Sequence, residues 1–151
     1  MTPQAQIIQD YALHPYEWGT RDCITLTNAL LASYGYDPVE ETYSAQGYET
    51  ALQQAVNAPN GGLAGVYTEV LSAHPAITEV SGAYHPFDIV VLRGEMLFKD
   101  GGSTTEGSPA TLGVVGPDFA VYTFHKDGLR EVFTDREDQA FRIKSGPGAG
   151  D

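Results

Sequence analysis

The fold of this chain is decided around residues 15–23, which read Pro-Tyr-Glu-Trp-Gly-Thr-Arg-Asp-Cys. This stretch leads from a proline turn into an apolar segment and places the only cysteine, Cys23, at a predicted helix start. Free backbone N–H groups and the helix dipole stabilise a thiolate at such a position, which suits a nucleophile. A lone cysteine also serves as a small buried apolar residue, so position alone leaves both interpretations open.

Helical patterns lie on both sides of this stretch. Thr2 can cap a first helix with Pro3 in its first turn, and His14-Pro15 ends that helix. Apolar residues then recur at three- and four-residue steps from Cys23 to Tyr34, where Gly35 supplies a left-handed stop. We expect four helices, over residues 2–13, 22–34, 48–58 and 63–73, the last of which ends at His74-Pro75.

Beyond residue 76 the apolar period becomes that of β-strands. Ile89–Leu92 is a continuous apolar run that is typical of a central strand, and residues 119–125 alternate. Lys126-Asp127-Gly128 is a hairpin signal. We expect strands over residues 89–92, 112–115, 119–125, 129–133 and 140–144. Helices followed by an antiparallel sheet predict an α+β domain.

One domain over residues 1–144 fits the length of 151 residues. Residues 145–151 are rich in Gly and Pro, which predicts a flexible tail. Met96-Leu97-Phe98 lies in a long loop, where it forms either a short extra strand or an exposed apolar tip that docks on a partner.

Composition excludes several classes of function. The formal net charge is −12 with only eight Lys and Arg residues, which argues against nucleic acid and against anionic membrane surfaces as partners. The chain has no long apolar run and no basic-then-apolar start, so we expect neither membrane insertion nor a recognisable export signal. No metal-ligand spacing and no phosphate-binding loop occurs, so we expect no metal and no cofactor.

Several motifs together resemble a known family. Pro15-Tyr16-x-Trp18-Gly19 followed by Asp22-Cys23 resembles the nucleophile segment of the NlpC-type cell-wall cysteine peptidases. The whole chain is similar to a small phage-encoded branch of that family, made up of tail-associated proteins of unknown function. The further matching positions are Tyr43, Gly47, Gly61-Gly62-Leu63, Asp88-Ile-Val-Val, Leu112-Gly113-Val114-Val115-Gly116, Asp127-Gly128-Leu129 and Ala140-Phe141-Arg142-Ile143.

The resemblance implies a papain-like fold and assigns candidate catalytic residues. Cys23 matches the nucleophile, and Tyr16 matches a tyrosine that lies beside the nucleophile near the oxyanion site. The family's base histidine opens the second strand, but alignment on Gly113 puts Thr111 there, and threonine cannot accept a proton near neutral pH. His125 could act in its place only if its strand is shifted by one pleat, because the family's third polar residue falls nearest Thr123.

Three functions therefore remain open. The first is a tail-tip or hub component of a phage virion, contacting other phage tail proteins and keeping a degenerate peptidase fold. The second is an active cysteine peptidase or amidase that cleaves peptidoglycan peptides during infection. The third is a peptide- or glycan-binding module without catalysis. The resemblance implies residence in the virion, and in the host cytoplasm before assembly.

Overall fold

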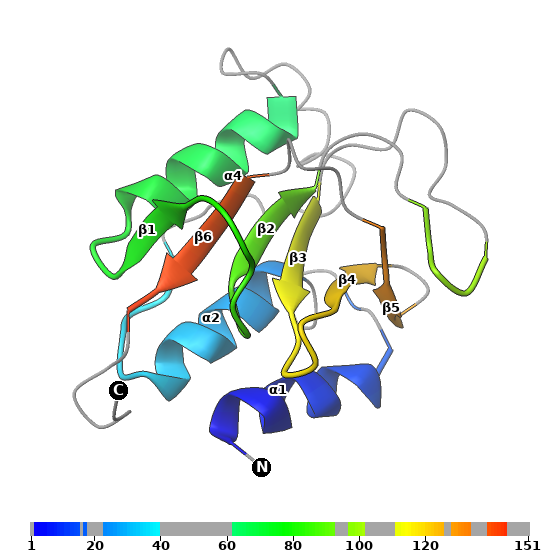
Figure 1. Cartoon of the computed structure of the whole chain (residues 1–151). Helices are drawn as coiled ribbons and strands as arrows, with labels where there is room; N and C mark the ends of the chain where they lie inside the picture. The colour runs from blue at the N-terminus through cyan, green and yellow to red at the C-terminus, as the bar shows by residue number, and fades with distance from the viewer. Residues whose placement is uncertain are drawn as a thin grey trace.

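The structure is a computed structural model that describes residues 2–15, 17, 23–39, 62–92, 97–101, 111–125, 128–133 and 139–144. Within these ranges three helices accompany a six-stranded antiparallel sheet (Figure 1), which confirms the predicted α+β class. The predicted helix over residues 48–58 and the tail 145–151 lie outside the described ranges. The elements are α1 Pro3–Ala12, α2 Cys23–Ser33, α4 Gly62–Ala73, β1 Ile77–Val80, β2 Ile89–Leu92, β3 Thr111–Val115, β4 Val121–His125, β5 Gly128–Glu131 and β6 Gln139–Ile143.

Helix α1 begins as its sequence predicts. The Thr2 hydroxyl accepts a hydrogen bond from the Ala5 backbone N–H at 3.1 Å, and Pro3 occupies the first turn. Ile8 and Tyr11 are buried on one face of this helix. The helix ends at Ala12, one residue earlier than expected.

Helix α2 begins at Cys23 and ends at Ser33, and Gly35 beyond it has φ +87°, the left-handed conformation that the sequence predicts. Leu26, Thr27 and Leu30 are buried as expected, and Leu31 is buried as well. The predicted stripe omitted Leu31 because α2 contacts both α1 and the sheet, so more than one side of the helix is covered.

The strand order in the sheet is β1-β6-β2-β3-β4-β5. The C-terminal strand β6 therefore lies inside the sheet, between β1 and β2, rather than at an edge (Figure 1). The edge strand β1 was not predicted, since its four residues Ile-Thr-Glu-Val carry too little pattern to stand out.

Strand alternation separates the sheet into two apolar faces. Ile89, Val91, Leu112 and Val114 belong to the cluster that contains the buried residues of α1, α2 and α4. The alternate positions form a second cluster with Phe98 and Val132; its sheet residues are Val90, Leu92, Val115 and Val121. The three helices therefore cover one face of the sheet, and the second cluster lies on the other.

An ion pair between a buried carboxylate and a half-buried arginine ties the residue before β2 to β6. Asp88, only 1% exposed, accepts hydrogen bonds from Nε and from one terminal nitrogen of Arg142, both at 2.9 Å. Asp88 also accepts from the His85 backbone N–H at 2.9 Å. Burial and the negative charge of Asp88 raise the pKa of Tyr34, and the hydrogen bond to Asp88 raises the pKa of Arg142. This carboxylate fixes the entry of β2 into the sheet.

Two strand predictions need correction. Strand β4 begins at Val121 rather than at residue 119, because Phe119 lies in the turn with φ +68° and is 61% exposed. Strand β5 ends at Glu131, and Val132 instead forms an isolated bridge with Phe98. Phe98 is buried in this bridge, as the short-strand alternative predicts, whereas its neighbour Leu97 is 56% exposed. Met96 lies outside the described residues.

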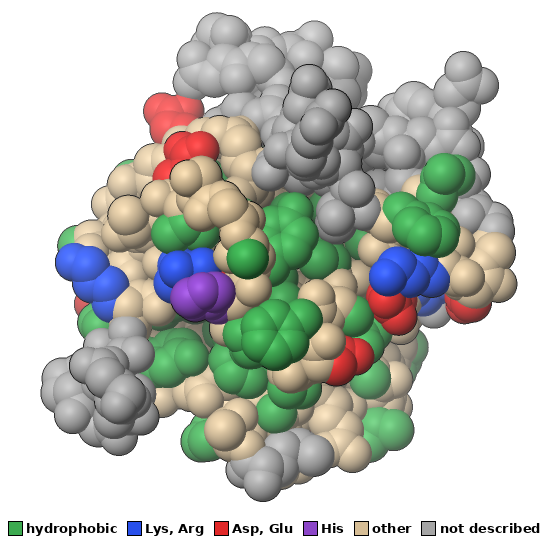
Figure 2. Space-filling view, viewed as in Figure 1, with side chains coloured by type: hydrophobic (Ala, Val, Ile, Leu, Met, Phe, Trp, Pro, Cys, Tyr) green, Lys and Arg blue, Asp and Glu red, His purple; other side chains and the backbone are tan. Residues whose placement is uncertain are grey.

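Exposed apolar side chains remain around this framework. Figure 2 shows such side chains at the surface between basic and acidic groups, on the face seen in Figure 1. The exposed large apolar residues among those described are Leu13, Leu97, Phe119 and Phe133. No described helix has the length and apolar character needed to cross a bilayer.

The hairpin between β3 and β4 is held by a tyrosine–aspartate pair. The Tyr122 hydroxyl donates to the Asp118 carboxylate at 2.7 Å, and Asp118 also accepts from the Ala120 backbone N–H at 3.3 Å. The hydrogen bond to Asp118, burial and the charges of Asp118 and Glu131 raise the pKa of Tyr122 to about 12. The same hydrogen bond lowers the pKa of Asp118.

We therefore predict that Asp118→Asn brings the Tyr122 pKa back toward about 10, because the charge and its hydrogen bond are lost. Tyrosine ring carbon shifts followed by NMR during an alkaline titration measure this, and Glu79→Gln is the control. The same pair also makes stability depend on pH at the acid end. Because the Asp118 pKa is lowered in the folded protein, its contribution to the free energy of unfolding is present above the pKa of an unperturbed aspartate and is lost as pH falls through the folded-state pKa. Tyr122→Phe should reduce that acid-dependent loss, because the largest of the interactions that lower the Asp118 pKa is then missing. A Tyr122 pKa unchanged by Asp118→Asn contradicts the pairing.

Candidate functional site

Cys23 is the first residue of α2, as the sequence predicts for a nucleophile at a helix start. The helix behind it is anchored on two sides. Ile24 is buried in the core, and the Thr25 hydroxyl accepts a hydrogen bond from the Tyr11 hydroxyl of α1 at 3.0 Å. Helix α2 also contacts β3 and β4. Tyr16 lies outside the described residues, as do Trp18 and Asp22.

Thr111 opens β3, so the alignment placed it correctly at the start of a strand. Its backbone position pairs with Leu92 of β2. Two residues later, Gly113 pairs with both Val90 and Thr123. A Cβ atom at Gly113 would lie 2.8 Å from Leu92 Cδ1 and 3.1 Å from the Tyr122 carbonyl oxygen. The glycine of this motif therefore has a packing role where three strands meet.

Strand β4 carries the two remaining candidates, Thr123 and His125. Thr123 pairs with Gly113, in the same row of the sheet as Val90, and is fully buried. Its hydroxyl donates to the Leu112 carbonyl oxygen at 3.3 Å. This row belongs to the face that carries the second apolar cluster, opposite the face that the helices cover. The sheet therefore separates Thr123 from α2.

His125 is two residues beyond Thr123 and pairs with Gly128 of β5. The pairs from Val121 to Thr123 with β3, and from Tyr122 to His125 with β5, run without interruption. Among the residues that the structure describes, no three His, Cys, Asp or Glu side chains are grouped as a metal site.

The other three histidines lie in turns, as predicted. His14 donates through Nδ1 to the Asp10 carbonyl oxygen at 2.7 Å, beside the Asp10 carboxylate. His85 is exposed in the segment that precedes β2. His74 spans a longer distance in the chain, since its Nε2 lies 2.8 Å from the Asp37 carbonyl oxygen.

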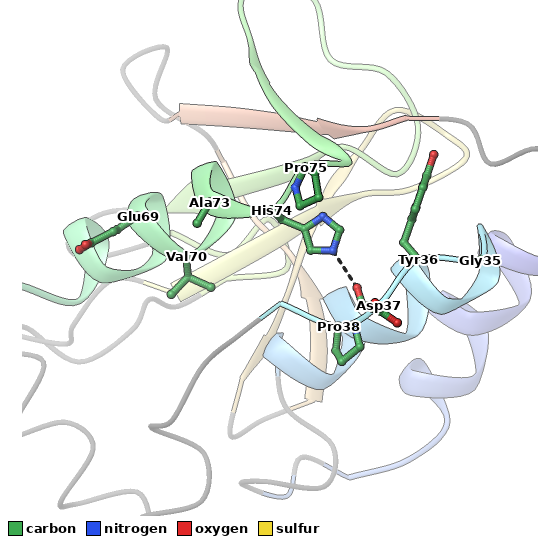
Figure 3. A pocket seen from close by; sticks show the side chains of 9 residues that line it. All are labelled: Gly35, Tyr36, Asp37, Pro38, Glu69, Val70, Ala73, His74 and Pro75. Carbon is green, nitrogen blue, oxygen red and sulfur yellow. Dashed lines mark hydrogen bonds between the residues drawn. The ribbon is translucent and has the colours of Figure 1, made fainter.

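A pocket at this histidine was missed by the sequence interpretation. It lies between residues 35–38, which follow α2, and residues 69–75 at the end of α4, and its volume is about 540 Å³. The described residues that line it (Figure 3) are Gly35, Tyr36, Asp37, Pro38, Glu69, Val70, Ala73, His74 and Pro75. The two helix stops, Gly35 and His74-Pro75, are visible in the sequence, but nothing in the sequence says that they meet.

Comparison with known proteins gives one match. No curated protein and no solved structure is detectably similar to this chain. The sequence profile of one family, described as a domain of unknown function (DUF6950), matches residues 2–143, which is nearly the whole chain. The chain therefore belongs to the DUF6950 family of domains of unknown function.

Proposed function

We propose that this chain is a structural component of a phage tail, at the tip or hub, built on a papain-like fold that has lost peptidase activity. The placement in a tail rests on the resemblance described above. The proposed loss of activity is supported by one observation, that Thr123 pairs in the row of Val90, on the face of the sheet opposite the helices.

Cysteine acyl transfer needs a base within hydrogen-bond reach of the thiol and a polar group that orients the base. Thr111 stands where the base is expected, and a hydroxyl side chain does not take a proton near neutral pH. Thr123, nearest to the expected orienting group, is buried in the opposite face of the sheet and bonded to the backbone. A general base contributes about 10²–10⁴-fold to such reactions, so little turnover would remain.

The start of α2 supports the papain-like interpretation of the fold. Cys23 begins a helix that contacts neighbouring antiparallel strands, which is the arrangement that the resemblance implies. The same helix start also supports a second candidate function, an active peptidase or amidase acting on peptidoglycan peptides, because a helix start alone can activate a thiol. The two functions differ in whether Cys23 works with His125.

The pH dependence of Cys23 alkylation in the native protein separates them. We predict either slow alkylation of Cys23 at every pH at which the protein stays folded, or an apparent Cys23 pKa near the ordinary thiol value of about 8.5. In both cases His125→Ala should leave the profile unchanged, and Cys23→Ser gives the blank. An apparent pKa at least about one unit lower that rises in His125→Ala would show a thiolate–imidazole pair and would overturn the loss of activity.

The place of the chain in a virion needs its own test. We predict that purified particles of the phage that encodes the chain contain it, and that Cys23→Ser particles assemble and infect as well as the parent. Deletion of the gene should instead give particles with defective tails. Quantitative mass spectrometry, electron microscopy and plating efficiency measure these outcomes. Absence of the chain from particles would reject the tail assignment, and loss of infectivity in Cys23→Ser would favour the enzyme.

A further inference from the structure

Two turns at one end of the sheet carry phenylalanine in a backbone conformation that suits glycine. Phe87 has φ +72° and Phe119 has φ +68°, and no other non-glycine residue in the described part of the chain has a positive φ. Figure 1 shows both turns at the end of the sheet where β2 begins and β3 ends. A bulky side chain is strained at positive φ. Each position therefore needs an interaction that offsets the strain.

Phe87 has such an interaction within the chain. The Asp88 N–H donates to the His85 carbonyl oxygen at 3.1 Å, which closes a turn with Pro86 second and Phe87 third. A positive φ at the third position defines a type II turn, where glycine or asparagine is usual. The Phe87 side chain packs against the apolar cluster of the helix-covered face. This burial offsets the strain of its backbone.

Phe119 occupies the corresponding glycine position of the β3–β4 hairpin. Its N–H donates to the Gly116 carbonyl oxygen at 3.0 Å, and the Gly116 N–H donates to the Ala120 carbonyl oxygen at 2.8 Å. These bonds close a three-residue loop whose last residue is usually glycine. The Phe119 side chain is 61% exposed. An exposed phenylalanine alone is ordinary, but this one is also strained and lacks the burial that offsets the strain at Phe87.

The tip of this hairpin is held in one conformation. The Asp118 carboxylate accepts hydrogen bonds from the Tyr122 hydroxyl at 2.7 Å and from the Ala120 N–H at 3.3 Å. Gly116 is buried at the base of the tip, where a Cβ atom would lie 2.7 Å from Asp118 Oδ1 and 2.8 Å from Tyr122 Cε2. The tip therefore presents Phe119 on a pre-organised backbone, which lowers the entropy lost when a side chain enters a binding pocket.

We propose that Phe119 is the anchor by which this chain docks on another protein of the phage tail, with its ring in an apolar pocket bordered by basic residues. The identity of the partner rests on the proposed function. Aromatic side chains that fill a partner's pocket supply much of the binding energy of an interface. The Asp118 carboxylate beside the ring and the net charge of −12 favour basic residues around that pocket. The same charge disfavours an anionic bilayer as the surface that receives the ring.

Thermal unfolding of the isolated chain tests whether Phe119 acts outside its own fold. Phe119→Gly should raise Tm by about 1–4 °C, because the strain is relieved and no buried contact is lost. Phe87→Gly relieves the same kind of strain but removes packing from the core, so it should lower Tm. A lower Tm in Phe119→Gly would show that the ring stabilises the chain itself and would overturn the proposal.

Crosslinking in purified phage particles tests the docking directly. The photoreactive analogue p-benzoylphenylalanine replaces Phe119, or Phe133 as the control, since Phe133 is 57% exposed and has no positive φ. Irradiation should join position 119 to a peptide of another tail protein, with a yield at least about tenfold above that from position 133. Equal yields from both positions, or products from position 119 with lipid or a second copy alone, overturn the proposal.

The amount of the chain in particles completes the test. Particles made with Phe119→Gly should contain at least about tenfold less of the chain than the parent, whereas Phe133→Ser should leave the amount unchanged. Quantitative mass spectrometry measures both amounts. Full incorporation of Phe119→Gly would overturn the anchor and leave the tail assignment standing. Absence of the parent chain from particles would instead reject the proposed function and the anchor together.

Discussion

The antiparallel register from β2 through β5 is the constraint on which the rest of the structure depends. Gly113 pairs with Val90 on one side and Thr123 on the other, and a Cβ at this position would meet Leu92 at 2.8 Å and Val121 at 3.2 Å. A side chain there would have to displace both neighbours. The register assigns alternate residues to the helix-covered face and to the second cluster, and a slip of one residue would exchange the two sets.

This register also decides what the candidate active site can do. A cysteine at a helix start and a histidine on a neighbouring strand are residue types that a thiol peptidase uses. Residue type is less informative here than the face of the sheet on which each residue lies, because Thr123 lies on the face that the helices do not cover. A sheet stands between Thr123 and α2, and no adjustment of a side chain rotamer crosses it. In the function proposed above, Cys23 stands at a helix start while Thr123 lies on the far side of the sheet.

Local signals in the sequence predicted local structure well. Thr2-Pro3 gave the start of α1, Gly35 gave the stop after α2, and four apolar residues gave the buried strand β2, because capping, φ and burial act over a few residues. Insertion of β6 between β1 and β2 could not be predicted, since it depends on pairing across about 60 residues. The pocket at His74 was missed for the same reason. Cys23 and Thr111 were placed correctly on their elements, whereas the separation of Thr123 from α2 emerges only from the assembled sheet.

The sole native cysteine allows the central claim, that His125 does not reach Cys23, to be measured directly. In His125→Cys, a disulfide with Cys23 requires Cα atoms about 4.4–6.8 Å apart. The proposed loss of activity predicts that mild oxidation of the native protein leaves both thiols free, and that the disulfide forms only after unfolding. The double variant with Cys23→Ser serves as the control. Rapid, complete formation of an intramolecular disulfide in the native protein would contradict this account and would place position 125 at the nucleophile.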